Sequence, residues 1–193
     1  ADGRAGRILG FFVSEKVPFL MEVCDRTPAD RKGGHLAVQD GHLILREGAQ
    51  CPPEDMDAFQ DIDTHRYFNT NNLWIDLVAL KREIEEKDGY IPLPLIRNAK
   101  TVDPKDTRST PVYQLEGAMG AAIAVFEGAR ALRVPHSRFV PVKTCGDLLR
   151  LRSDATVLTG NFRLVPSPDA VATPVLVDLD PGFYRLVTDL DLH

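Results

Sequence analysis

The sequence predicts a mixed α/β fold built around one sheet. Short apolar runs, too short for helices, alternate along the chain with longer segments whose apolar residues recur at helical spacing. An Asp40-Gly41 pair between two strand-like runs adds a hairpin. The 193 residues, 44% hydrophobic and 26% charged, suffice for one folded unit with a sizeable core and match an ordinary globular composition.

The amino-terminal part predicts a helix, a buried strand and a hairpin. Residues 4–15 carry apolar side chains at helical spacing, and the pattern ends before Pro18. Phe19–Cys24 is a short apolar run typical of a strand buried in an α/β sheet. His35–Val38 and His42–Glu47 flank the Asp-Gly pair, and these two residue types suit the positive φ of a two-residue turn.

The rest of the chain continues the alternation. Two prolines and two acids at residues 52–55 favour the start of a helix, and Trp74 begins the clearest amphipathic helix, which Gly89 ends. Prolines 166, 168 and 174 predict a linker over residues 166–193 and leave residues 1–165 as the folded domain. The expected elements are helices at Pro52–Ile62, Trp74–Lys87, Ala118–Leu132 and Asp147–Leu151, strands at Leu93–Arg97 and Val112–Leu115, a hairpin within Thr156–Pro166 and an amphipathic stretch at Phe183–Leu192.

Composition argues against several classes of protein. A net charge of -5 gives no positive field to attract nucleic acid. The apolar stretch Ile8–Val13 is far too short to span a bilayer, so no membrane partner is expected. Cys24, Cys51 and Cys145 are widely separated, which argues against a disulfide framework and a zinc site. We expect a cytoplasmic protein.

Two segments carry residues suited to ligand binding. Asp30-Arg31-Lys32-Gly33-Gly34-His35 sets two glycines beside a cation, where backbone amides can approach an anion; a tight turn before the hairpin is the alternative that composition alone favours. Phe68-Asn69-Thr70-Asn71-Asn72-Leu73-Trp74 holds three asparagines, whose amides match sugar hydroxyls. Helix capping by Asn71 or Asn72 is the alternative for this segment.

Three further polar residues are weaker candidates. Glu47 closes the predicted hairpin and can accept hydrogen bonds from hydroxyls. Lys100 and Lys143 each follow an apolar strand-like run, and the carboxyl end of a strand is where open α/β sheets bind ligands. Taken alone, each of these residues is more often a solvated surface residue.

In order along the chain, these segments resemble the UDP-glucose pyrophosphorylase family of nucleotidyltransferases. The resemblance extends from residue 21 to about residue 149. It rests on Met21-Glu22-Val23, Asp30 to Gly34, Phe68 to Trp74, Asn98-Ala99-Lys100-Thr101, Gln114-Leu115-Glu116 with Met119 to Ile123, and Ser137-Arg138-Phe139 through Leu149.

The resemblance implies the second half of a nucleotide-diphospho-sugar transferase domain, Rossmann-like with a mixed sheet and a β-hairpin insertion. It implies synthesis of UDP-glucose and pyrophosphate from UTP and glucose 1-phosphate by in-line attack of the sugar phosphate on the α-phosphorus. Gly33, Gly34, Glu47 and Asn71 would hold the glucose, and Phe139 would shape the pocket. Lys143 would be the catalytic cation, with Lys32 and Lys100 as further phosphate contacts.

The resemblance also implies parts that this chain does not contain. The glycine-rich nucleotide loop and the Mg²⁺ ligands would precede Ala1, and a β-helix would follow His193. We therefore expect no metal ligand in the chain, no activity from it alone, and Phe19–Cys24 as an unpaired sheet edge prone to self-association.

The sequence departs from the family pattern at Gly48, Arg97 and Gly117. Two alternatives stay open: a non-catalytic module that binds a sugar phosphate or a partner chain, and a pyrophosphorylase for another hexose 1-phosphate.

Overall fold

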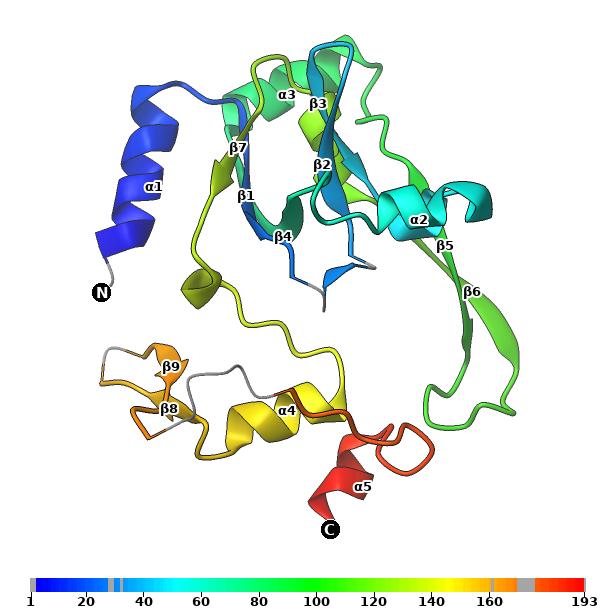
Figure 1. The fold of residues 1–193 in the computed structure, drawn as a ribbon. Helices are drawn as coiled ribbons and strands as arrows, with labels where there is room; N and C mark the ends of the chain where they lie inside the picture. The colour runs from blue at the N-terminus through cyan, green and yellow to red at the C-terminus, as the bar shows by residue number, and fades with distance from the viewer. Residues whose placement is uncertain (1–2, 28–29, 32, 161, 170–175, 193) are drawn as a thin grey trace. The chain divides into compact units, whose positions relative to one another are not determined.

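The computed structural model describes residues 3–27, 30–31, 33–160, 162–169 and 176–192. Lys32, Pro174 and His193 therefore lie outside the described residues. The described chain divides into two compact units, Gly3–Pro135 and the residues from His136 onward, and Figure 1 shows the elements of each. The linker expected from residue 166 stays a prediction.

A five-stranded mixed sheet forms the centre of the first unit. Its strands are β1 (Phe19–Asp25), β2 (His35–Gln39), β3 (His42–Arg46), β4 (Tyr67–Ile75) and β7 (Arg130–Arg133), in the order β3-β2-β4-β1-β7. β1 runs antiparallel to β4 and parallel to β7, and the remaining neighbours are antiparallel. The predicted α/β fold with a mixed sheet is confirmed.

β1 lies inside this sheet, so the prediction that Phe19–Cys24 is an unpaired edge is wrong. β4 pairs with one side of the strand and β7 with the other. All six residues from Phe19 to Cys24 are buried. The segment that pairs as β7 was expected to be helical, which is why sequence reasoning left β1 without a second neighbour.

The predicted hairpin is confirmed as β2 and β3, which pair from His35↔Arg46 to Gln39↔His42. Asp40 and Gly41 have φ angles of 50° and 83°. Both central residues are in the left-handed region that a two-residue turn of this type requires.

Helix α1 (Gly3–Ser14) confirms the first predicted helix. α3 (Leu77–Glu86) begins later than predicted, because Trp74 belongs to β4. The cap of α3 is Asp76, whose carboxylate accepts hydrogen bonds from the N–H groups of Val78 and Ala79. Helix capping by Asn71 or Asn72 is therefore wrong.

Two other predicted helices are largely absent. Pro52–Ile62 forms only a 3-10 turn, η3 (Pro53–Asp55), and α2 (Met56–Phe59), after a further turn η2 (Gly48–Gln50). Ala118–Leu132 forms the 3-10 helix η4 (Met119–Ala124) and then β7. Pairing with β1 overrides the helical preference of this segment, and Gly128, at φ 78°, makes the turn into the strand.

The core lies between the sheet and η4. It joins alternate residues of β1 to Leu45 of β3 and to Ile123 and Phe126. The rings of Phe19 and Phe126 stack with centroids 5.4 Å apart. This packing holds the strands that carry the candidate site.

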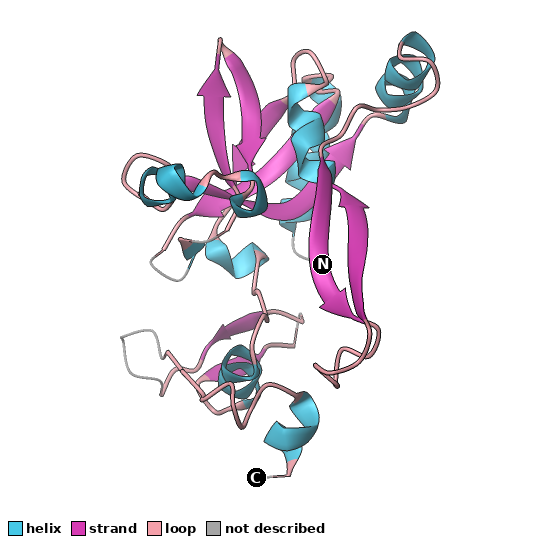
Figure 2. Ribbon diagram, turned by 90° about the vertical axis from the view of Figure 1, so that its right-hand side faces the viewer, coloured by secondary structure: helices cyan, strands magenta, loops and turns pink. Residues whose placement is uncertain are grey.

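β5 (Leu95–Thr101) and β6 (Pro111–Gly117) form a separate two-stranded ribbon. Both are longer than the strands predicted for these segments, and Figure 2 shows them as a pair of long strands. Every residue of β6 is exposed.

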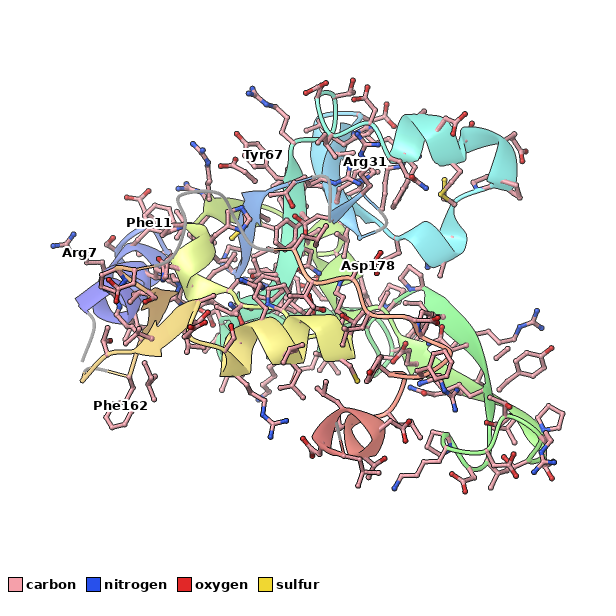
Figure 3. All side chains as sticks on the ribbon, turned by 60° about the horizontal axis from the view of Figure 1, so that its bottom comes forward. Arg7, Phe11, Arg31, Tyr67, Phe162 and Asp178 are labelled. Atoms are coloured by element: carbon pink, nitrogen blue, oxygen red, sulfur yellow. The ribbon has the colours of Figure 1, made fainter. Side chains whose placement is uncertain are left out.

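The second unit contains η5 (His136–Arg138), α4 (Cys145–Arg152), the hairpin of β8 (Thr156–Leu158) and β9 (Leu164–Pro166), and α5 (Val187–Asp191). The short helix and the hairpin are confirmed, and the terminal amphipathic stretch is helical only in α5. Phe162, labelled in Figure 3, lies at the hairpin turn and is 87% exposed. The three cysteines are free. Among the described residues, no helix has the length and apolarity needed to cross a membrane.

Candidate functional site

Gly34 lies directly against the carboxylate of Glu47. A Cβ atom at Gly34 would be 2.5 Å from Glu47 Oε2 and 2.8 Å from Oε1. No side chain larger than hydrogen fits there without moving the carboxylate. The loop before β2 and the residue after β3 thus meet at one place, because β2 and β3 are paired over their whole length.

β4 bulges where the asparagine segment crosses β1. The register passes from Met21↔Leu73 to Val23↔Asn69, so that Thr70, Asn71 and Asn72 lie opposite Glu22 alone. Asn71 has a φ angle of 63°, a left-handed conformation that asparagine tolerates better than most residues. Asn71 is exposed, whereas Thr70 is buried.

Hydrogen bonds join this bulge to the glycine loop. The Asn69 N–H donates to the Gly34 carbonyl at 3.1 Å, and the Asn71 N–H donates to Asn69 Oδ1 at 2.8 Å. The structure thus brings four of the predicted site residues to one part of the sheet: Gly33, Gly34, Glu47 and Asn71. Carboxylate, amide and backbone groups at a partly open surface can both donate to and accept from hydroxyls.

Glu22 is a buried charged residue beneath the bulge that the site prediction left out. It is fully buried in β1. Glu22 Oε1 accepts a hydrogen bond from the Trp74 indole at 2.9 Å, and its carbonyl accepts one from Thr70 Oγ1 at 2.8 Å. An acid inside the otherwise apolar run Phe19–Cys24 is the sequence signal that points to it, because acids are rarely buried without partners.

A basic cluster beneath the glycine loop was also missed. The Arg26 guanidinium is 3.3 Å from Nδ1 of His35, whose ring stacks on His65 with centroids 4.1 Å apart. Burial, with His65, Arg26 and Arg46 nearby, lowers the pKa of His35 to about 3. The ring is neutral at physiological pH. Sequence alone does not reveal that Arg26 lies beside His35.

Lys100, Lys143 and Phe139 belong to other elements of the chain. Lys100 is inside β5, opposite Val112 on the separate ribbon, and does not follow a strand of the main sheet. Lys143 follows a loop, and its prediction as the end of a strand is wrong: its N–H donates to Asp147 Oδ2 at 3.0 Å, just before α4. Phe139 is half-buried beside η5 in the same unit. Lys32 lies outside the described residues.

Comparison with known proteins decides the family. The family model described as UTP–glucose-1-phosphate uridylyltransferase matches residues 5–192. The chain belongs to this family. The resemblance inferred from the motifs is confirmed, and the match extends beyond them at both ends.

Relatives within the uridylyltransferase family are similar over nearly the whole chain. A UTP–glucose-1-phosphate uridylyltransferase of Saccharomyces cerevisiae is 46% identical over 162 residues, 83% of this chain and 32% of its own length. The solved UDP-glucose phosphorylase of Trypanosoma brucei is 50% identical with a TM-score of 0.83, covering 96% of this chain and 40% of that one.

A mutant UDP-glucose pyrophosphorylase of Leishmania major, solved in complex with UDP-glucose, is 52% identical with a TM-score of 0.81, and the match covers 96% of this chain and 41% of that one. The chain therefore spans between about a third and two fifths of the length of these family members.

Metal binding was expected to come from outside this chain. Within the described ranges, no group of three or more His, Cys, Asp and Glu side chains is arranged to hold a metal ion. The described side chains therefore do not form a complete metal site of this kind.

Proposed function

We propose that this protein acts in the transfer of a uridylyl group from UTP to glucose 1-phosphate, giving UDP-glucose and pyrophosphate. One observation carries the proposal: Gly34, Glu47 and the bulged Asn71 are joined by contacts and hydrogen bonds into a single polar surface. Family membership supports it, as does a similar protein solved with UDP-glucose.

The sugar is the part of the substrate that this surface recognises. Gly33 and Gly34 let backbone groups approach the hexose closely. The Glu47 carboxylate accepts hydrogen bonds from hydroxyls, and the Asn71 amide both accepts and donates. Phe139 adds an apolar wall, and Lys32 and Lys100 add charge toward the phosphates.

The reaction needs positioning and charge neutralisation more than covalent catalysis. A phosphate oxygen of glucose 1-phosphate attacks the α-phosphorus in line, and pyrophosphate leaves. Lys143, exposed before α4, supplies a flexible point charge to the phosphate oxygens as negative charge develops. Bound Mg²⁺ would supply further charge neutralisation, with ligands from outside this chain.

The proposal extends to the architecture of the domain and to the cellular compartment of the protein. Residues 1–165 are the second half of a Rossmann-like nucleotide-diphospho-sugar transferase domain, with the β2–β3 hairpin as an insertion. The reaction takes place in the cytoplasm, where the free cysteines stay reduced.

A full-length chimaera tests the function. The 193 residues of this chain replace the matching segment of the Leishmania major enzyme. The measured quantity is the UDP-glucose formed from UTP and each of a panel of hexose 1-phosphates. We expect turnover with a preference for glucose 1-phosphate. A folded chimaera that prefers another hexose would refute the assignment of glucose, and one without turnover would favour a non-catalytic sugar-phosphate module.

A further inference from the structure

Arg26 follows β1 and is almost completely buried, with 7% of its surface exposed. Its guanidinium meets main-chain carbonyls from two separate segments and the ring of His35. A guanidinium offers five N–H donors in a rigid plane, so it can join several carbonyls at fixed positions. Burial lowers the pKa of Arg26, but the group keeps its charge at physiological pH.

One set of contacts holds the glycine loop. Arg26 Nη2 donates to the Arg31 carbonyl at 2.6 Å and lies 3.5 Å from the Asp30 carbonyl. The loop is closed on itself by the Thr27 N–H, which donates to Asp30 Oδ2 at 2.9 Å, and by the Gly33 N–H, which donates to the Asp30 carbonyl at 2.9 Å. The guanidinium therefore holds the turn that leads directly into Gly33 and Gly34.

A second set of contacts ties the same guanidinium to the approach to β4. Arg26 Nη1 donates to the carbonyl of His65 at 3.1 Å and to that of Phe59 at 3.2 Å. Figure 3 labels residues of the two joined segments, Arg31 on the loop and Tyr67 at the start of β4. β4 carries the asparagine bulge, so one side chain links both parts of the candidate sugar surface.

His35 contacts the same guanidinium nitrogen, Nη1, as the carbonyls of His65 and Phe59. It is fully buried next to Gly34 in sequence, and its neutral ring presents Nδ1 to Arg26 at 3.3 Å. Because main-chain pairing between β2 and β4 is limited to His35↔Phe68 and the Asn69–Gly34 hydrogen bond, the strands themselves restrain the loop weakly.

We propose that Arg26 is a positioning residue for the hexose, because its guanidinium holds the described part of the glycine loop, residues 30–31 and 33–34, against the segment entering β4 and thereby places Gly34 and Glu47 relative to Asn71. The inference rests on the proposed function. Arg26 is too deeply buried to touch substrate, so it acts through the loop and not as a catalytic residue.

Hydrogen exchange on the 193-residue chain tests the positioning without any substrate. In Arg26→Met, exchange of the Gly33 and Asn69 amides should become about tenfold faster or more, as expected when charge-assisted hydrogen bonds are lost. Exchange of the β1 amides should change little. Arg133→Met is the matched control. Arg133 is an exposed arginine at the end of β7, and it forms an ion pair with Asp25, the last residue of β1.

Kinetics of the chimaera test the consequence for the sugar. Arg26→Met should raise KM for glucose 1-phosphate about tenfold, while KM for UTP stays within about twofold. A tenfold change corresponds to a loss of about 1.4 kcal/mol in the binding free energy of the sugar phosphate. Arg26→Lys keeps the charge but not the planar fork and should recover part of the loss. Arg133→Met should leave both KM values unchanged.

The outcomes distinguish a failure of the positioning role of Arg26 from a failure of the proposed function. Unchanged exchange at Gly33 and Asn69, or an equal rise in both KM values, overturns the positioning role. A chimaera without turnover refutes the proposed function but leaves the exchange experiment decisive for Arg26. If Arg26→Met does not fold, Arg26→Lys decides by the same two measurements: exchange and KM values like those of the parent overturn the proposal, and partial changes confined to the loop and the sugar support it.

Discussion

Replacing Gly34 with alanine perturbs the candidate site at a single atom. The new Cβ would lie 2.5 Å from Oε2, 2.7 Å from Cδ and 2.8 Å from Oε1 of Glu47. Gly34 is not among the residues with positive φ, so alanine can adopt its backbone conformation. The conflict is therefore with the end of a flexible side chain, and we expect the fold to survive with a melting temperature close to that of the parent.

The size of the functional effect follows from this geometry. The carboxylate must withdraw by about 1 Å to restore ordinary van der Waals contact, which would break the hydrogen bond that we propose between Glu47 and a sugar hydroxyl. A hydrogen bond to a charged group contributes about 1.5–3 kcal/mol. Gly34→Ala should thus raise KM for glucose 1-phosphate in the chimaera between about tenfold and about 150-fold, with little change in KM for UTP.

A double-mutant cycle with Glu47→Ala shows whether the effect passes through Glu47. Once the Glu47 carboxylate is absent, the added methyl of Gly34→Ala has room, and the second substitution should cost little more. Equal losses from Gly34→Ala with and without Glu47 would refute the reasoning, as would an unchanged KM in the single variant. Gly117→Ala is the control, because its Cβ would approach other side chains no closer than 3.8 Å.

Four further predictions follow from single residues. Lys143→Ala should lower kcat of the chimaera about 10²–10³-fold with an unchanged melting temperature, because Lys143 is exposed; near-normal turnover would remove it from the mechanism. Asn71→Ala should raise KM for glucose 1-phosphate and leave KM for UTP unchanged, and an equal rise in both would contradict its assignment to the sugar. Gly120→Ala should lower the free energy of urea unfolding by about 1–3 kcal/mol, because its Cβ would lie 2.5 Å from Cδ2 of Leu45; a smaller loss would show that the core yields. Burial lowers the pKa of His35 from its ordinary 6.5 to about 3 in the folded state, so its stabilising contribution is complete above pH 6.5 and falls toward pH 3. His35→Gln should therefore reduce the slope of the unfolding free energy between about pH 4 and 5.5 by up to about 1.4 kcal/mol per pH unit, and parallel curves for the variant and the parent would contradict this.

Local pattern was sufficient where neighbours along the chain determine the conformation. The helix at α1, the buried strand β1 and the turn at Asp40-Gly41 depend on spacing and on φ preferences that adjacent residues specify. The polar motifs also identified the family, because the order of the glycine, asparagine and lysine segments can be read directly from the sequence.

Prediction failed where a distant strand overrides local preference. Residues 118–132 are rich in alanine, but the last of them pair with β1 as β7. Trp74 was expected to begin a helix and instead belongs to β4, which pairs with β1 as a bulged strand. Strand pairing satisfies backbone groups through partners far away in the chain, and that information is not contained in any local window.

The sequence by itself determined the composition, the α/β class, the hairpin and the residue types suited to a hexose. Only the tertiary structure decided that Glu47 lies against Gly34, that Asn71 adopts a left-handed conformation in a bulge, and that Arg26 joins the glycine loop to the approach to β4. The reason is physical: these contacts depend on close approach between segments separated by many residues, and their ångström-scale distances are set by how the sheet twists and packs, not by the chemistry of each residue alone.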